Sequence, residues 1–140
     1  MDIIKGVAKS MGLAYKFGTY KEANYLFDRS DKTELPAVCE LTPLKGSFEI
    51  RYEAVKDSQE ITLLFLDIDQ KTVNSEKTAE IIDRMKSKAL DFIKLLNETG
   101  RYEVIDETSL EYYTVVKQFD KSLSGLEITL KLTPVNATCL

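Results

Sequence analysis

Two aspartates at the end of an apolar segment are the residues best suited to chemistry in this chain. Asp67 and Asp69 close the run Leu63-Leu-Phe-Leu-Asp-Ile-Asp69. Two positions apart on a strand, their carboxylates share one side, where they could hold Mg²⁺ for phosphoryl transfer. The sequence offers no third acidic ligand beside them, no phosphate-binding glycine loop and no lysine partner. We therefore favour the alternative, in which they end the strand and turn the chain, and we expect neither a metal nor a cofactor.

The other residue types that support catalysis are scarce. The chain contains no histidine, which removes the commonest general base near neutral pH and every Ser–His or Cys–His nucleophile pair. Of the two cysteines, Cys39 lies in a predicted strand and is expected to be buried as a small apolar residue. Cys139 is next to the last residue, and two cysteines do not make a four-ligand zinc site. No catalytic residue is assigned, and the chain is predicted not to be an enzyme.

Size and charge restrict the class of protein further. The 140 residues suit a single domain spanning 1–140, and 44% hydrophobic with 30% charged residues indicate a folded core. A net charge of −4 and the lack of any Lys/Arg run argue against binding to nucleic acid or anionic membranes. No apolar stretch approaches the roughly 20 residues of a membrane helix, and the N-terminus does not resemble a secretory signal. We expect a protein that remains in the cytoplasm where it is made.

Two helices would position these residues. Apolar residues three and four apart predict a short helix over residues 2–14. A long amphipathic helix is predicted over 75–99, with Ser75 as its N-cap and Gly100 as the glycine after its last turn. Its apolar stripe consists of Ile81, Ile82, Met85, Ala89, Phe92, Ile93 and Leu96. A stripe of this length needs a sheet to cover.

The strands of that sheet follow from alternation and turn residues. Residues 37–41 form a first strand, stopped by Pro43 and Gly46, and residues 48–54 form a second whose apolar face is expected to be buried and whose charged face is solvated. A turn is expected at 56–59, before a strand over 61–68 that is apolar on both faces and therefore central. Further strands are expected at 102–105, 110–119 and 126–132, the last two joined through the loop 120–125. The fold class is α+β: an antiparallel or mixed sheet of about five to six strands, packed by a short N-terminal helix and one long helix.

Tyrosines and polar loops indicate a surface that binds other proteins. The chain has seven tyrosines, a residue type enriched at protein interfaces. The loops 28–34 and 120–124 are predicted to be exposed and able to reach a neighbour. The alternative for each tyrosine is a position at the margin of the core. The candidate interface residues are Tyr15, Tyr20, Tyr25, Asp28, Arg29, Asp31, Lys121 and Ser122.

Several short patterns follow one another along the chain: Glu22-Ala-Asn24 with Asp28, Pro36-Ala-Val-Cys39, Phe65-Leu-Asp67, Met85-Lys-Ser-Lys-Ala89, Phe92-Ile-Lys-Leu95, and Phe119-Asp120 before Gly125-Leu-Glu-Ile-Thr-Leu130. In this order they resemble small neck and tail proteins of tailed bacteriophages. The chain is most similar to the tail terminator, or tail-completion, family and its head–tail connector relatives. This resemblance implies a structural subunit of a ring, typically a hexamer, which caps the tail tube and joins it to the head connector. It implies no catalytic residue.

The resemblance also implies partners and a location. The partners would be copies of the chain itself, the tail tube and proteins on the portal side of the neck, in a virion assembled in the host bacterial cytoplasm. DNA would pass through the lumen without specific binding, with which the acidic net charge agrees. Exposed edges and loops would supply the head-to-tail contacts that close a ring. The alternative is a small cytoplasmic adaptor with no virion role, and a metal-dependent phosphotransferase built on Asp67 and Asp69 is the least favoured interpretation.

Overall fold

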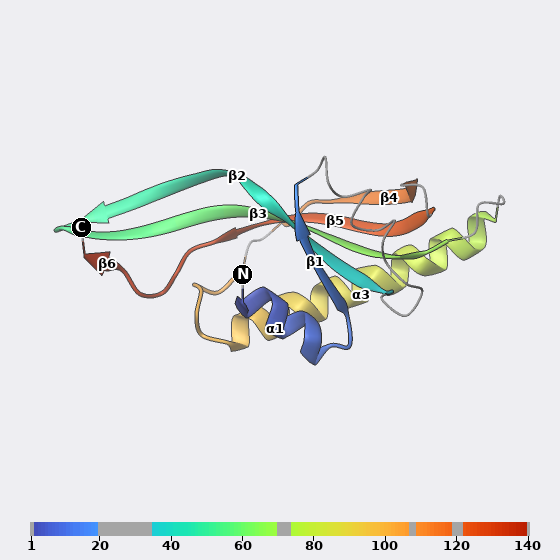
Figure 1. The fold of residues 1–140 in the computed structure, drawn as a ribbon, viewed down its shortest axis with the longest axis horizontal. Coiled ribbons are helices and arrows are strands. Elements are labelled where there is room, and N and C mark those ends of the chain that lie inside the picture. The colour runs from blue at the N-terminus through green and yellow to red at the C-terminus, as the bar shows by residue number, and fades with distance from the viewer. Residues whose placement is uncertain (1, 20–34, 70–73, 107–108, 119–121, 140) are drawn as a thin grey trace.

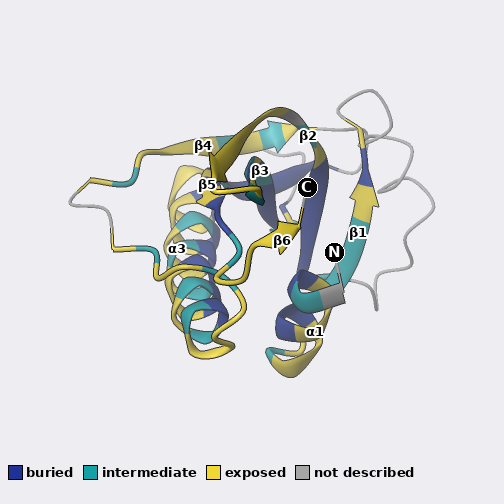
Figure 2. Ribbon diagram, turned by 90° about the vertical axis from the view of Figure 1, so that its left-hand side faces the viewer, coloured by how far each residue is buried: buried dark blue, intermediate teal, exposed yellow. Residues whose placement is uncertain are grey.

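The chain folds into an α+β structure in which both helices lie on one face of a twisted sheet (Figures 1 and 2). The computed structural model describes residues 2–19, 35–69, 74–106, 109–118 and 122–139. Its elements are α1 (Asp2–Ser10), β1 (Ala14–Gly18), β2 (Ala37–Arg51), β3 (Ala54–Ile68), α3 (Ser75–Glu98), β4 (Tyr112–Gln118), β5 (Leu123–Leu132) and β6 (Thr138–Cys139). The predicted fold class is therefore confirmed.

The described strands form one mixed sheet of six strands. The order is β1-β2-β3-β5-β4, and β6 pairs with β3. β1 and β2 are parallel, whereas all other pairs are antiparallel. β3 is central, as predicted, because its second half is apolar on both sides and is covered on both. Leu63 and Phe65 belong to the core under the helices, whereas Leu64 and Leu66 belong to a second cluster on the opposite face.

The long helix α3 occupies the predicted position and covers the sheet with one face. The side chains that it buries recur every three or four residues: Thr78, Ile81, Met85, Ala89, Phe92 and Leu96. Phe92 meets Phe65 edge to face with ring centroids 5.4 Å apart, a geometry worth about 0.5–1.5 kcal/mol beyond area burial. The helix ends where Gly100 adopts φ +67, as the sequence predicted. No helix in the described ranges has the length and apolar character needed to cross a bilayer.

Some element boundaries differ from the sequence prediction. The short N-terminal helix ends at Ser10 instead of residue 14, and β1 (Ala14–Gly18) follows it where no strand was predicted. The N-cap of α3 is Asn74, whose side chain accepts a hydrogen bond from the Lys77 N–H, and not Ser75. The predicted strand at 102–105 is reduced to a single bridge between Tyr102 and Pro134.

The largest difference concerns the first two predicted strands, which are one strand. β2 runs without a break from Ala37 to Arg51. Pro43 lies in an irregularity of its pairing with β3, between Leu41 and Lys45, whereas Gly46 is paired with Gln59. The turn expected at 56–59 is also wrong. The chain reverses at Tyr52 and Glu53, so residues 56–59 continue β3.

A candidate protein interface

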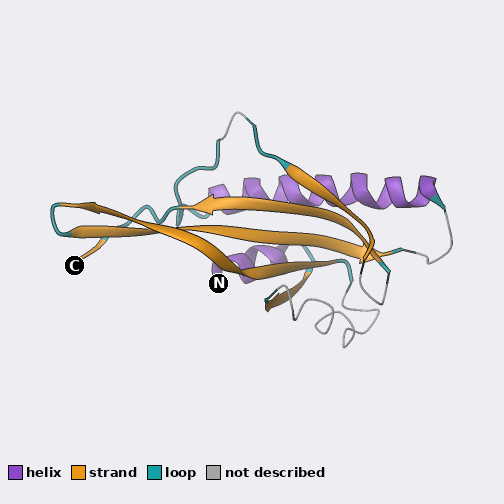
Figure 3. Cartoon of the chain, turned by 90° about the horizontal axis from the view of Figure 1, so that it is seen from above, coloured by secondary structure: helices purple, strands orange, loops and turns teal. Residues whose placement is uncertain are grey.

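β2 and β3 continue together as a long hairpin past the end of the helices (Figures 1 and 3). We call residues 46–59 the arm, which begins where Gly46 pairs with Gln59. Residues from the C-terminal segment and from the loop after α3 contact it. β6 pairs with Ala54 and Val55, Lys56 forms a 3.2 Å ion pair with Glu103, and the Ser58 and Thr133 hydroxyl oxygens lie 2.8 Å apart in a buried hydrogen bond. These contacts hold the arm as a defined projection from the body, which is the rest of the described chain.

The tip of the arm combines an unusual backbone conformation with full exposure. Tyr52 and Glu53 have φ values of +49 and +67. Positive φ at both central residues is the conformation of the tight hairpin turn that fits the strand twist, although Asn and Gly usually occupy it. A non-glycine residue there costs on the order of 1–3 kcal/mol, and such strain often marks a functional position. The Tyr52 side chain is 100% exposed, so nothing in the described chain uses this aromatic group.

One face of the arm is apolar and uncovered. Phe48 is 72% exposed and Ile50 58%. Phe48 pairs with Asp57, and Ile50 pairs with Val55, so these side chains share a face. By strand alternation this is the face of β3 on which Phe65 packs against the helices. The arm thus extends the inner face of the sheet beyond its helical cover, and we call the side chains of Phe48, Ile50 and Tyr52 the arm patch.

This exposure corrects the sequence prediction, which assigned the apolar face of residues 48–54 to the core. The alternation itself was correct, with Glu49 and Arg51 on the opposite face. What the alternation could not reveal is the length of the helical layer, which ends before it reaches the arm (Figure 3). The arm patch is therefore a surface that sequence reasoning missed.

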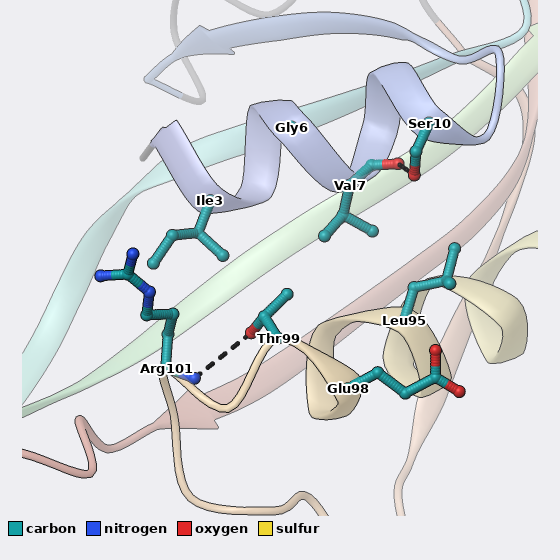
Figure 4. A pocket seen from close by; sticks show the side chains of 8 residues that line it. All are labelled: Ile3, Gly6, Val7, Ser10, Leu95, Glu98, Thr99 and Arg101. Atoms are coloured by element: carbon teal, nitrogen blue, oxygen red, sulfur yellow. Dashed lines mark hydrogen bonds between the residues drawn. The ribbon is translucent and has the colours of Figure 1, made fainter.

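A second apolar feature lies between the two helices. Ile3 and Val7 of α1 face Leu95 and Thr99 near the end of α3 across a shallow groove (Figure 4). Its volume is about 440 Å³. Gly6 leaves the middle of the α1 wall without a side chain. Ser10, Glu98 and Arg101 complete the rim, and we call these eight residues the groove.

A third exposed surface follows β4. This strand pairs with β5 and forms the end of the sheet order, and Tyr113 is 66% exposed on it. The Lys86 ammonium lies 4.8 Å from the ring centroid of the neighbouring Tyr112, a cation–π geometry. Between α3 and β4, a cavity of about 150 Å³ has an almost wholly apolar lining that includes Leu90 and Ile93. The aromatic edge of β4 is thus a smaller candidate contact surface.

Neither a protein-family model nor a curated protein matches this chain. The assignment of function therefore depends on the surfaces of the molecule itself.

The structure describes two of the eight predicted interface residues, and both contribute to internal contacts. The Tyr15 hydroxyl donates a 2.7 Å hydrogen bond to the Glu40 carboxylate, and its ring is half-buried. Ser122, expected on an exposed loop, is only 4% exposed because it lies beside the end of β3, where its carbonyl accepts from the Asp69 N–H at 2.8 Å. The predicted exposure of Ser122 is wrong. The other candidates, Tyr20, Tyr25, Asp28, Arg29, Asp31 and Lys121, lie outside the described residues.

The two aspartates considered for a metal site have separate structural roles. The Arg84 guanidinium forms a 2.7 Å ion pair with Asp67. Asp69 is buried, and one of its oxygens accepts from the Thr78 and Ser124 hydroxyls at 2.6 and 2.7 Å. Asp67 thus ties the end of β3 to α3, and Asp69 ties it to both α3 and β5. No group of three or more possible metal ligands occurs in the ranges that the structure describes.

Cys39 is buried as the sequence predicted. It lies in the second cluster, on the sheet face opposite the helices, with Leu64 nearby in the same cluster. Burial, with a further contribution from the Glu40 charge, raises the pKa of the Cys39 thiol to about 12, against an opposing effect of Lys16. The nucleophilic thiolate is therefore scarce at neutral pH. Cys39 packs as a small apolar residue.

Proposed function

We propose that this chain is a non-enzymatic structural subunit that assembles into a homo-oligomeric ring at the neck or tail of a tailed bacteriophage, in the manner of a tail terminator or tail-completion protein. The observation that carries the proposal is the arm: a hairpin projecting from the body with three large apolar side chains, Phe48, Ile50 and Tyr52, in solvent.

The energetics of the arm favour a role in assembly. None of its residues belongs to either core cluster, so the body does not need its apolar side chains. Exposed apolar groups gathered on one projecting element are typical of contact sites. A buried aromatic side chain removes roughly 150–250 Å² from water, at about 25 cal/mol per Å². Covering Phe48 and Tyr52 alone would supply several kcal/mol towards association on this scale.

A ring also requires two different surfaces on each subunit, one for each neighbour. The arm patch and the groove are different in shape and lie on separate elements, so a contact between them can pass head to tail from one copy to the next. The same contact made reciprocally between two copies would give a closed twofold dimer instead. Ring-shaped particles of more than two copies distinguish the first arrangement from the second.

The phage assignment is supported by the resemblance of the sequence patterns and by the α+β fold that they lead one to expect. On this proposal the ring, most simply a hexamer, sits between the tail tube and the head connector. DNA passes through it without specific binding, in keeping with the net charge of −4.

Two measurements test the proposal. Sedimentation velocity with negative-stain microscopy of the purified chain should show concentration-dependent assembly and ring-shaped particles. Mass spectrometry of purified phage particles from the source strain should find the chain in a fixed ratio to tail proteins. A chain that stays monomeric at millimolar concentration and is absent from particles would refute the proposal.

The edge of β4 favours a second candidate function, a cytoplasmic adaptor. An exposed edge strand bearing Tyr112 and Tyr113 can receive an extended peptide by strand addition. In that case substitution of Tyr113 would abolish binding of the partner and substitutions in the arm would not. The ring proposal predicts the reverse for self-assembly.

A further inference from the structure

The geometry points to a specific contact between copies: the arm patch of one subunit occupies the groove between α1 and α3 of the next subunit. This inference rests on the proposed function, because it supplies the contact by which a ring would close. The proposed occupant of the groove is thus a second copy of the chain.

The first argument is that the arm lacks the layer that covers the rest of its own face. Within the body, this face of β3 packs on two helices, with Phe65 against Phe92 as the central contact. Phe48 and Ile50 are exposed on the continuation of that face, and the helices that the structure describes end before the arm (Figure 3). Two helices with an apolar groove between them would therefore cover the arm patch in the way that α1 and α3 cover the same sheet face in the body.

The groove offers such a partner on the outer side of the same helices. Its walls come from α1 and α3, and its lining is mostly apolar because of Ile3, Val7 and Leu95. Gly6 has no heavy atom within 4 Å of an added Cβ, so the space above it is open to another chain. The groove of one subunit could thus act as the missing helical layer for the arm of its neighbour.

Charge agrees with this pairing, and the arm patch supplies part of the area. Its three side chains would bury on the order of 400–500 Å², about half of the roughly 800 Å² per partner in a stable interface, so the flanking surfaces of the two copies must bury the rest. On the face of the arm, Asp57 lies directly opposite Phe48, and Arg101 stands at the rim of the groove. A contact between these two charges at the rim would fix the register of the arm more than its affinity.

Two variants that leave the body intact separate the two sides of the contact. The arm variant carries Phe48→Ser and Ile50→Ser, both at exposed positions, and its control carries Glu49→Ser and Arg51→Ser on the other face of the same strand. The groove variant carries Gly6→Gln, which fills the open space, and its control is Lys5→Gln, the same side chain at an exposed position of α1 outside the groove. Each variant alone should weaken self-association by about thirtyfold or more, the effect of losing one interface hot spot, whereas both controls should assemble like the wild type.

Mixing the two variants gives a sharper result. The arm variant retains a working groove and the groove variant retains a working arm, so one contact of the proposed kind remains possible between them. Sedimentation velocity should show a one-to-one heterodimer that grows no further. A contact between two arms, or between two grooves, would not produce this complementation.

The outcomes distinguish the inference from the function on which it rests. If the wild type assembles and both variants assemble equally well, the arm–groove contact is refuted while the ring proposal stands. The arm–groove contact is likewise refuted if the mixture forms no heterodimer. If the wild type itself does not associate at millimolar concentration, this contact is refuted, and the ring proposal is refuted as well if the chain is also absent from phage particles.

Discussion

Glu40 is a carboxylate buried within the sheet, only 3% exposed, and Tyr15 is the group that makes this position tolerable. Desolvation raises the pKa of Glu40 above its ordinary value of 4.5, and the hydrogen bond from Tyr15 opposes that rise. Because the folded state holds this proton more tightly than the unfolded chain, the contribution of Glu40 to stability falls as pH rises through its folded pKa. The pair is thus a structural device with a defined pH dependence.

Tyr15→Phe tests this pair. Without the hydroxyl, the Glu40 pKa rises further. At pH 4 the carboxyl is mostly protonated in both the folded and the unfolded chain, so the loss of stability there should be small. The loss should grow with rising pH as the carboxyl ionises, and its upper bound at pH 7 is about 1.5–3 kcal/mol, the range for a hydrogen bond to a charged group. Urea unfolding at both pH values measures the difference, with the exposed Tyr113→Phe as the control. An equal loss at both pH values would contradict the assigned role.

Among the elements, α3 depends on a cap that the sequence misidentified. Asn74 accepts from the Lys77 N–H at 3.1 Å, which satisfies one of the free donors at the start of the helix. Asn74→Ala should therefore lower the free energy of unfolding by about 1 kcal/mol. Ser75→Ala, one residue along, should change it by only a few tenths. Thermal unfolding of both variants shows which residue is the N-cap. A larger loss of stability for Ser75→Ala than for Asn74→Ala would mean that Ser75 is the cap, as predicted from the sequence.

The pairing of β3 with β5 depends on Gly125. It faces Leu66 in the register, and an added Cβ would overlap the Phe65 carbonyl oxygen. Since that oxygen belongs to the backbone of the central strand, Gly125→Ala must push the two strands apart and should cost about 2–4 kcal/mol. Gly6→Ala, in open space on α1, should instead stabilise the fold by about 0.5–1 kcal/mol. Denaturant unfolding would contradict this account if both changes were equally mild.

The elements that could be predicted from sequence are those whose signals are local. The 75–99 helix carries its own stripe and terminal glycine, and the apolar run at 61–68 is long enough to indicate a central strand. The position of the hairpin turn was predicted wrongly because the polar residues 56–59 are of types common in turns. Tyr52 and Glu53, where the chain reverses, are not. Pro43 and Gly46 suggested a break because their pairing with β3, irregular around Pro43 and regular at Gly46, is not revealed by any local pattern.

The candidate site was less predictable for a related reason. Tyr15 and Ser122 were chosen for residue type and expected exposure, yet both turn inward because of partners distant in sequence, namely Glu40 for Tyr15 and the end of β3 for Ser122. The arm patch was assigned to the core because its alternation is that of a core strand. What covers an apolar face is a property of the tertiary arrangement, and here the described chain provides no cover.

As a whole, the molecule divides into a body that holds both core clusters and an arm that holds neither. This division makes the arm removable. Gly46 lies directly opposite Gln59, so replacing residues 47–58 by Asn-Gly would close the hairpin with a favoured two-residue turn. The shortened chain should keep the helical circular dichroism of the wild type.

Its stability should fall by only about 1 kcal/mol, because the main buried interaction that the deletion removes is the hydrogen bond between Ser58 and Thr133. Its self-assembly should disappear, since the arm patch leaves with the arm. Circular dichroism, urea unfolding and sedimentation velocity measure the three quantities on one sample. If the shortened chain failed to fold, the arm would belong to the folding unit. If it folded and still assembled, subunit contacts would have to lie elsewhere, with the edge of β4 as the next surface to alter.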